Sequence, residues 1–276
     1  MTNEPTGGGQ TRKWARQGFY EGRGAPVEGR GAVSGGTSLA GRVPEAVGVR
    51  TLSRLLSNRL LGALPGEEFE RLLPALEPVT LAGRDKLDDS REAQHVYFPE
   101  DSVVSHLVLM EDGSTVEAAM TGREGLVGLG AVLGQHAPSH WMRVTLAGSA
   151  LRMRAETFRR EFAAGDGFRR LLLEHAGRHF LQVTQRAACI SRHRVEPRLA
   201  VWLLMLHDRA GSDVLALTQE FIARRLGTRR AGITEVAGRF QERGLIAYSR
   251  GTLRVLDRAG LEATACECYG VLRDAN

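Results

Sequence analysis

Four arginines lie within seven residues of the stretch TQEFIARRLGTRRAGITEVAGRF, which runs from residue 218 to residue 240. The planar guanidinium group of arginine can form paired hydrogen bonds with phosphate oxygens or with the edge of guanine. The same stretch has apolar residues at helical spacing and a central glycine. A solvated helix needs no apolar face, and a disordered basic arm has none. The stretch therefore indicates a folded surface that binds a polyanion. The four arginines are Arg224, Arg225, Arg229 and Arg230.

The distribution of charge along the chain supports this interpretation. The net charge is +5, but residues 51–177 carry −4 and residues 178–258 carry +8. All fifteen basic residues of the second segment are arginines. A mildly acidic segment followed by a strongly basic one predicts two parts with different partners, and the basic part favours a polyanion.

Two helices that meet at Gly227 would bring the apolar residues of this stretch into one continuous set. The spacing predicts a first helix over residues 218–226 and a second over residues 229–243. Thr218 is the expected N-terminal cap of the first helix, because its hydroxyl can accept a hydrogen bond from a free backbone N–H group. The expected core of the pair is Phe221, Ile222, Leu226, Ile233, Val236, Ala237 and Phe240.

The second helix has its own start, stop and continuation signals. Thr228 is its expected cap, and Gly244 is expected to end it. The sequence that follows, LIAYSRGTLRVLD, predicts two short strands around Arg250-Gly251. The predicted unit is a helix-turn-helix with a wing beside it.

The part of the chain before this unit changes character twice. Residues 1–50 are rich in glycine and have almost no aliphatic pattern, which predicts an unstructured tail. The repeated GRG leaves an arm that contacts RNA or DNA as an alternative. Residues 51–166 begin with two short helical patterns and continue as many short strands, with a hairpin turn at residues 111–113. This pattern predicts a small β-roll, the expected sensor domain.

A long helix is predicted over residues 167–193, before a basic domain at residues 194–276. Its apolar residues recur at spacings of three and four, which is typical of the seam of a two-stranded parallel coiled coil. A homodimer is therefore expected, and the alternative is a helix buried across its own β-domain. The expected seam is Phe168, Leu172, Ala176, His179, Val183, Ala187 and Ile190.

The order of these elements, together with LTQEFIARRLGTRRAGITEVAGRFQERGLIAYSRGTLRVLD, resembles the Crp/Fnr family of bacterial transcription regulators. The resemblance runs from about residue 58 to residue 269. It implies an α+β fold with an N-terminal β-roll of the cyclic-nucleotide-binding-like jelly-roll type, a long dimerisation helix and a C-terminal winged helix-turn-helix. It also implies a homodimer that binds double-stranded DNA, with RNA polymerase as a further candidate partner.

The resemblance can be carried to single residues only in part. Arg230 falls where family members place the recognition-helix arginine that reads guanine. Arg229, Ala231 and Glu235 replace the residues that are common at their positions, so the usual half-site sequence is not expected. The candidate DNA-binding residues are Thr218, Thr228, Arg229, Arg230, Gly232, Thr234, Arg224 and Arg250.

The sensor departs from the cyclic-nucleotide-binding pattern at one position. Glu124 in GREGLVGL could stand for the glutamate that binds the ribose, but Pro138 occupies the place of the arginine that binds the phosphate. A buried phosphate without a guanidinium partner loses a strong hydrogen-bonded contact. The expected effector is therefore not the usual cyclic nucleotide, and its identity stays open. The candidate effector-binding residues are Arg123, Glu124, Ser139 and Arg143.

No catalytic centre, cofactor or metal site is expected. The sequence has no serine–histidine–acid arrangement, phosphate-binding glycine loop or HExxH run. Cys266 and Cys268 would form half of a metal site, but no partner pair is expected near them. His175 and His179 are four residues apart, a spacing that can bind metal on a helix, but seam and surface roles are favoured.

The expected location is the cytoplasm, because no apolar run approaches the roughly 18 residues of a membrane span and the N-terminus has no secretory apolar core. The leading hypothesis is a DNA-binding transcription regulator. The alternative is an effector-binding or protein-interaction module that has lost specific DNA recognition, a possibility raised by Ala231 and Glu235.

Overall fold

The structure is a computed structural model that describes residues 57–87, 94–133 and 140–275. All of them fall within one compact unit, residues 45–276. The tail expected at residues 1–50 lies outside the described residues, as do Pro138 and Ser139.

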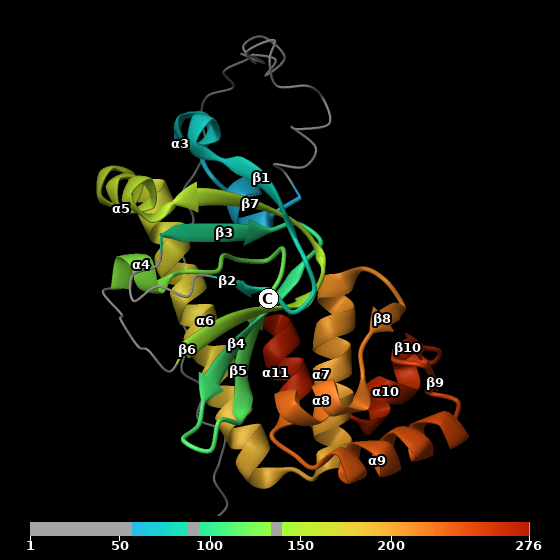
Figure 1. Ribbon diagram of the computed structural model, residues 1–276. Helices are drawn as coiled ribbons and strands as arrows, with labels where there is room; N and C mark the ends of the chain where they lie inside the picture. Colours follow the sequence, from blue (N-terminus) through green and yellow to red (C-terminus); the bar gives the residue numbers. More distant parts are fainter. Residues whose placement is uncertain (1–56, 88–93, 134–139, 276) are drawn as a thin grey trace, which may run out of the picture. The chain divides into compact units, whose positions relative to one another are not determined.

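The first part of the described chain is a β-roll with helices at its edges (Figure 1). Two antiparallel sheets form it, with strand orders β1-β7-β3 and β2-β6-β4-β5. Short helices α2 (Arg59–Gly62) and α3 (Gly66–Leu72) precede the strands, followed by one 3-10 turn at Leu73–Ala75. The strands are β1 (Glu77–Leu81), β2 (Lys86–Leu87), β3 (His95–Pro99), β4 (Val103–Leu109), β5 (Thr115–Thr121), β6 (His140–Leu146) and β7 (Gly148–Arg154).

The β4–β5 hairpin forms where the sequence predicts it. Its turn includes Asp112, whose carboxylate accepts a hydrogen bond from the backbone N–H of Ser114 at 2.9 Å. Gly113 follows with a φ of 78°, a conformation that glycine adopts without strain. In the segment GLVGL, Val127 forms an isolated antiparallel bridge with Tyr97 of β3.

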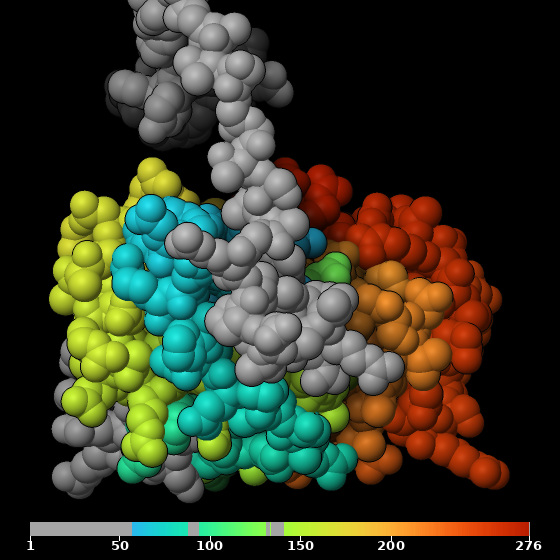
Figure 2. All heavy atoms as spheres, turned by 90° about the horizontal axis from the view of Figure 1, so that it is seen from above, coloured from blue at the N-terminus to red at the C-terminus, as the bar shows by residue number. Residues whose placement is uncertain are grey.

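Helices close one end of the roll. They are α4 (Gly130–Leu133), α5 (Ala155–Ala164) and the start of α6 (Asp166–Arg192). Phe158 and Phe168 meet edge to face with ring centroids 5.4 Å apart, and they share a buried cluster with Leu60 and Leu72. Figure 2 shows the same neighbourhood from outside, with the cyan residues of the first helices beside the yellow residues of α5.

Helix α6 is a single helix of 27 residues, as the apolar spacing predicts, but its buried face differs from the expected seam. Phe168 and Leu172 are buried in the core of their own roll. The apolar side chains that remain outside include Leu173 and Phe180, and Phe180 is 71% exposed. Each residue turns a helix by about 100°, so a seam read from spacing alone can be misplaced by a residue. The predicted seam is therefore buried at its start, whereas Ala187 and Ile190 near its end remain exposed.

The second part of the described chain begins with α7 (Val195–Ala210), which ends at Gly211 with a φ of 60°. Every residue from Leu199 to Leu206 is buried, so α7 is the central helix of this part. Around it lie β8 (Val214–Ala216), α8 (Gln219–Leu226), α9 (Arg230–Glu242), β9 (Ile246–Ser249), β10 (Thr252–Val255), α10 (Arg258–Thr264) and α11 (Cys268–Asp274). The three strands form a sheet in the order β8-β10-β9.

The two parts share one hydrophobic core. Val103 of β4 and Met120 of β5 belong to the same buried cluster as Trp202 of α7 and Phe240 of α9. A movement of α7 relative to the sheet would therefore expose apolar surface, which costs free energy. Among the described helices, none combines the length and the apolar character that a membrane span needs.

Candidate nucleic-acid interface

Helices α8 and α9 meet at a tight turn. Thr218 caps α8, and its hydroxyl oxygen accepts a hydrogen bond from the N–H of Phe221 at 3.1 Å, as predicted. Gly227 ends α8 with a φ of 58°, in the left-handed region that favours glycine. The expected capping role of Thr228 is wrong, because α9 begins at Arg230 and its N-terminal flanking residue is Arg229. Instead, the backbone N–H of Thr228 donates to the carbonyl of Ala223 at 3.0 Å and closes the turn.

The apolar set predicted for the pair holds the two helices together. Ile222 and Leu226 of α8 are buried, as are Ile233, Val236 and Phe240 of α9. Phe221 is only half-buried. Because these residues occupy the inner faces, the polar and charged residues of α8 and α9 are left for the outside.

Short contacts bring three candidate DNA-binding segments side by side. The hydroxyl of Thr234 in α9 donates to the amide oxygen of Gln219 in α8 at 2.6 Å. A Cβ atom built on Gly251 in the wing turn would lie 3.4 Å from the methyl group of Thr218. Arg250 precedes this glycine with a φ of 46°, and it is exposed. The start of α8, the first turns of α9 and the tip of the wing thus form one surface.

The exposed arginines of this region fall into two groups. Arg224 is exposed but forms an ion pair with Glu220 of its own helix at 2.9 Å. Arg239 is paired with Glu196 at 2.9 Å and with Glu235 at 2.6 Å. Arg224 and Arg239 thus belong to a first group that is paired with carboxylates. The arginines of the second group form no ion pair with a carboxylate of the described residues. Its members are Arg229, Arg230, Arg250 and Arg254.

Arg254 was not found from the sequence. It lies on β10, where exposed and buried residues alternate, and it is exposed. The alternation TLRV was the available signal, because it places the arginine on the face opposite Leu253 and Val255.

Arg225 was expected on the polyanion-binding surface with the other three arginines of the stretch, but it is buried. Its side chain is only 5% exposed, and its Nε lies 4.0 Å from Glu117 Oε2 in strand β5. The guanidinium group also lies over the ring of Phe221, 4.5 Å from the centroid. Burial lowers the pKa of Arg225, while the charge of Glu117 opposes that shift.

Glu117 joins the roll to three helices. The carboxylate is fully buried and accepts a hydrogen bond from the indole N–H of Trp202 in α7 at 2.7 Å. It also accepts from the hydroxyl of Ser105 at 2.5 Å. Arg186 of α6 is its second cationic neighbour, at 3.6 Å, and is as deeply buried as Arg225 of α8. One carboxylate of the β-roll therefore contacts α6, α7 and α8 together.

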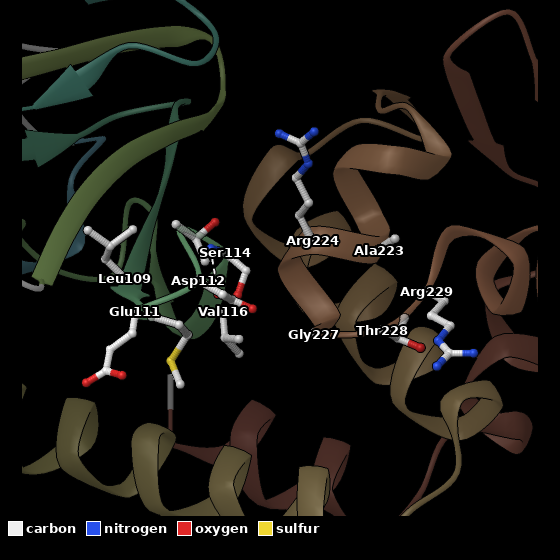
Figure 3. A pocket seen from close by; sticks show the side chains of 12 residues that line it. Leu109, Glu111, Asp112, Ser114, Val116, Ala223, Arg224, Gly227, Thr228 and Arg229 are labelled. Carbon is white, nitrogen blue, oxygen red and sulfur yellow. Dashed lines mark hydrogen bonds between the residues drawn. The ribbon is translucent and has the colours of Figure 1, made fainter.

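A cleft of about 810 Å³ lies between the tip of the β4–β5 hairpin and the α8–α9 turn (Figure 3). Glu111 and Asp112 line the hairpin side, and Gly227 and Arg229 line the other. Figure 3 shows the Arg229 side chain pointing away from the hairpin. A Cβ atom on Gly227 would lie 3.3 Å from Val116, so the turn is close to the sheet at this point.

The other candidate DNA-binding residues lie in α9. Thr234 is exposed, and Gly232 is half-buried in the first turn of the helix. A Cβ atom added to Gly232 would lie 3.8 Å from the hydroxyl oxygen of Thr228, and no other described side chain comes within 4 Å of it. A partner molecule can therefore come close to the backbone at Gly232. The hydroxyl of Thr234 is hydrogen-bonded to Gln219.

The candidate effector-binding residues are only partly brought together. Arg123 and Glu124 line a pocket of about 240 Å³ with Arg59, Asp208 and Arg209. Arg143 does not line this pocket among the described residues. It lies on β6, in register with Ser105 of β4. Ser139 lies outside the described residues.

Glu124 is bound within the chain. Its carboxylate accepts a hydrogen bond from Arg209 of α7 at 2.7 Å and another from the backbone N–H of Gly122 at 3.0 Å. Burial favours the neutral carboxyl group, but the charge of Arg209 and the N–H group of Gly122 outweigh it and lower the pKa of Glu124. The residue that would bind a ribose therefore holds the helix of the basic domain instead.

His175 and His179 face the sheet rather than a vacant ligand site. The ring of His175 is buried, and its Nε2 atom lies 3.2 Å from the carbonyl oxygen of Leu126. His179 stacks edge to face on His106 with centroids 4.6 Å apart. Burial lowers the pKa of His175, although the hydrogen bond to Leu126 opposes the shift.

The expectation that Cys266 and Cys268 have no partner pair nearby is wrong. Cys189 and His193, one turn apart at the end of α6, lie beside them. One potential ligand atom from each of these four residues lies within 4.8 Å of all the others. The spacing of Cys189 and His193, four residues apart on a predicted helix, was the signal in the sequence, but only the fold shows that the two pairs meet.

The comparison with known domain families agrees with the geometry of the basic domain. Residues 197–264 match the model of the Crp-like helix-turn-helix domain. This part of the chain is a Crp-like helix-turn-helix domain. No curated protein matches the chain as a whole.

Solved structures share the fold of both parts. A transcriptional regulator of the Crp/Fnr family from Eubacterium rectale aligns with a TM-score of 0.59 at 18% identity, over 75% of this chain and 98% of that one. FixK2 from Bradyrhizobium japonicum aligns at 0.58 and 16% identity, over 69% and 98%. The c-di-GMP-responsive regulator CLP from Xanthomonas campestris aligns at 0.57 and 17% identity, over 70% and 100%. The predicted fold, with a cyclic-nucleotide-binding-like roll ahead of the Crp-like helix-turn-helix domain, is confirmed.

Proposed function

We propose that this protein is a homodimeric transcription regulator of the Crp/Fnr type that binds double-stranded DNA in a sequence-specific way. The observation that carries the proposal is the unpaired cationic group of the winged helix-turn-helix. Among the described residues, no carboxylate pairs with Arg229, Arg230 or Arg250, although most arginines around them are paired. Exposed guanidinium groups without a counter-charge are available to a phosphate or a base.

Each candidate residue has a distinct role in this proposal. The first turn of α9 enters the major groove, because recognition helices present their N-terminal residues to base edges. Arg230 contacts guanine with two hydrogen bonds, and Arg229 contacts the adjacent backbone. Thr218 and Arg250 bind phosphates on either side. The backbone at Gly232 lets the groove wall come close.

The operator differs from the usual half-site of the family. Ala231 has no hydrogen-bonding group, and it is exposed at the position next to Arg230. The carboxylate of Glu235 is paired with Arg239 at 2.6 Å, which restrains it. A carboxylate in the groove can accept a hydrogen bond only from a donor such as the amino group of cytosine.

The dimer uses the outer face of α6. This helix would be about 40 Å long at 1.5 Å per residue. Its exposed apolar side chains would be buried by a parallel partner helix. Two DNA-binding domains joined in this way can occupy half-sites about one helical turn apart. The exposed apolar residues are Leu173, Phe180, Leu181 and Ile190.

The dimer is tested by sedimentation of Phe180→Glu, which should be monomeric because it places a charge in the seam. Glu156→Lys is the control, since Glu156 is exposed on α5 and lies outside α6. If Phe180→Glu remains a dimer at the same concentration, the interface lies elsewhere.

The alternative is a protein-interaction or effector-binding module that has lost specific DNA recognition. Selection from a random double-stranded DNA library separates the two. The proposal predicts an enriched two-fold symmetric motif and binding that weakens steeply with salt. Salt-dependent binding without enrichment of any motif would leave only a polyanion-binding module.

The effector is proposed to be something other than the usual cyclic nucleotide, and RNA polymerase is proposed as a further partner. The first proposal is supported by the ion pair that occupies Glu124. The candidate effector site is the pocket lined by Arg123, Arg209 and Arg273.

A further inference from the structure

Three cysteines and one histidine meet where α6 ends and the chain returns between α10 and α11. Cys189 and His193 come from the last turn of α6 and the residue after it. Cys266 and Cys268 flank Glu267 in the link between α10 and α11. The two sulfurs of Cys189 and Cys266 lie 3.7 Å apart, and Cys268 Sγ lies 3.7 Å from His193 Nδ1.

These distances match the edges of a tetrahedron around one metal ion. Zinc–sulfur bonds of about 2.3 Å and zinc–nitrogen bonds of about 2.05 Å give sulfur–sulfur edges of about 3.8 Å and sulfur–nitrogen edges of about 3.6 Å. All four ligand atoms lie within 4.8 Å of one another. An iron–sulfur cluster bonds its thiolates to different irons, so it needs a wider set of ligands than this one.

The surroundings of the four residues complete a metal site. His193 Nε2 lies 3.3 Å from the carboxylate of Glu267, the arrangement that orients a ligating imidazole through its other nitrogen. The side-chain amide of Gln185 donates to Cys268 Sγ at 3.1 Å. Cys189 and Cys268 are each only 1% exposed, so a site here is closed to bulk water.

We propose that Cys189, His193, Cys266 and Cys268 form a structural site for one Zn²⁺ ion. Three thiolates and one imidazole around a single ion are typical of a closed zinc site with no position left for a substrate. A disulfide between Cys189 and Cys266 would use only two of the four groups and would leave the convergence of Cys268 and His193 without a role.

The ion fixes the C-terminal segment across the junction of α6 and α7. Helix α6 ends at Arg192 and α7 begins at Val195, so a ligand at His193 lies in the junction itself. Arg198, in the first turns of α7, donates from Nη2 to the carbonyl of Leu226 at the end of α8. The site therefore holds the long helix and the Crp-like helix-turn-helix domain in one orientation. This consequence rests on the proposed function, whereas the binding of zinc does not.

Metal analysis of the full chain tests the proposal. Protein purified under reducing conditions and dialysed against zinc should contain one zinc per chain by mass spectrometry of the metal. Cys268→Ser and His193→Ala should lose it, with an affinity at least 10-fold lower. Ser191→Ala is the matched control, because Ser191 lies between two of the ligands, is exposed, and donates only to the carbonyl of Ala188.

Cobalt provides a test that needs no variant. Wild-type protein loaded with Co²⁺ in place of zinc should show a thiolate-to-cobalt charge-transfer band and the strong visible bands of a tetrahedral ion. A wild-type chain that holds less than a tenth of an equivalent of zinc and gives no such spectrum would overturn the proposal. So would iron with acid-labile sulfide in its place, or a native Cys189–Cys266 disulfide without metal. If the wild-type protein binds zinc but selects no DNA sequence, the proposed function is refuted and the zinc site is not.

Discussion

Replacing Glu117 with glutamine should destabilise the contact between the β-roll and the Crp-like helix-turn-helix domain. The glutamine keeps an acceptor for Trp202 but removes the negative charge between Arg186 and Arg225. Both arginine side chains are nearly buried, at 3% and 5% exposed. Each would be left with a positive charge and no carboxylate partner at this position.

The size of the effect follows from these distances. At about 4 Å and an effective dielectric constant of about 20, one unit-charge pair contributes about 4 kcal/mol before desolvation. Removing one partner of a buried ion pair typically costs about 3–5 kcal/mol. The unfolding free energy should fall by about that amount, which corresponds to roughly 6–20 °C in melting temperature for a domain of this size.

Urea unfolding and calorimetry measure the change. Glu111→Gln is the control, because Glu111 is exposed at the hairpin tip and its loss should change stability by less than about 0.5 kcal/mol. A Glu117→Gln/Arg225→Met double variant should recover part of the loss, since the buried cation is then gone. If the melting temperature of Glu117→Gln equals that of the Glu111→Gln control, the Glu117 carboxylate does not hold the two parts together.

Three further changes test other parts of the structure. Calorimetry with cAMP should show no saturable binding, because Glu124 is held by Arg209; micromolar binding would contradict this. The unfolding free energy should fall as pH drops below about 6.5, because burial lowers the pKa of His175 and the unfolded chain therefore binds the proton at a higher pH than the folded chain. Urea midpoints measured across this pH range should fall less steeply for His175→Gln. An identical pH profile for the variant and the wild type would contradict the prediction. Gly227→Ala should lower the unfolding free energy, measured in urea, by about 1–2 kcal/mol, because Gly227 has a φ of 58°. Gly238→Ala is the control and should be neutral or stabilising, because Gly238 lies inside α9 with open space beside it. Equal effects of the two changes would contradict the argument from backbone strain.

Local signals in the sequence were sufficient for the helix-turn-helix. The apolar spacing from Ile222 to Phe240 and the glycine at 227 predict both helices, and the apolar residues of both lie in one buried cluster. The hairpin at Gly113 was predicted for the same reason. Thr228 failed as a cap because the close turn draws its backbone N–H back to α8.

Long-range contacts were the part that sequence spacing could not supply. Arg225 lies in a run of arginines and looks like its neighbours, yet it is buried because strand β5 brings Glu117 to it from 108 positions earlier in the chain. The burial of Leu172, which was expected in the dimer seam, has the same origin, since Leu172 belongs to one buried cluster with residues of α2 and α5. Cys189 and Cys266 are likewise separated by 77 residues.

The most direct test of DNA reading by α9 compares Arg230→Ala with Arg224→Ala on the selected operator and on random DNA. A bidentate arginine–guanine contact contributes about 1–3 kcal/mol, so Arg230→Ala should reduce the preference for the operator by about 5- to 150-fold per half-site. Arg224 is exposed at the end of α8, and we propose that it exchanges its ion pair with Glu220 for a phosphate, so Arg224→Ala should weaken binding to both DNAs alike and reduce the salt dependence. Equal losses on operator and random DNA from Arg230→Ala would place that arginine on the phosphate backbone and contradict the account.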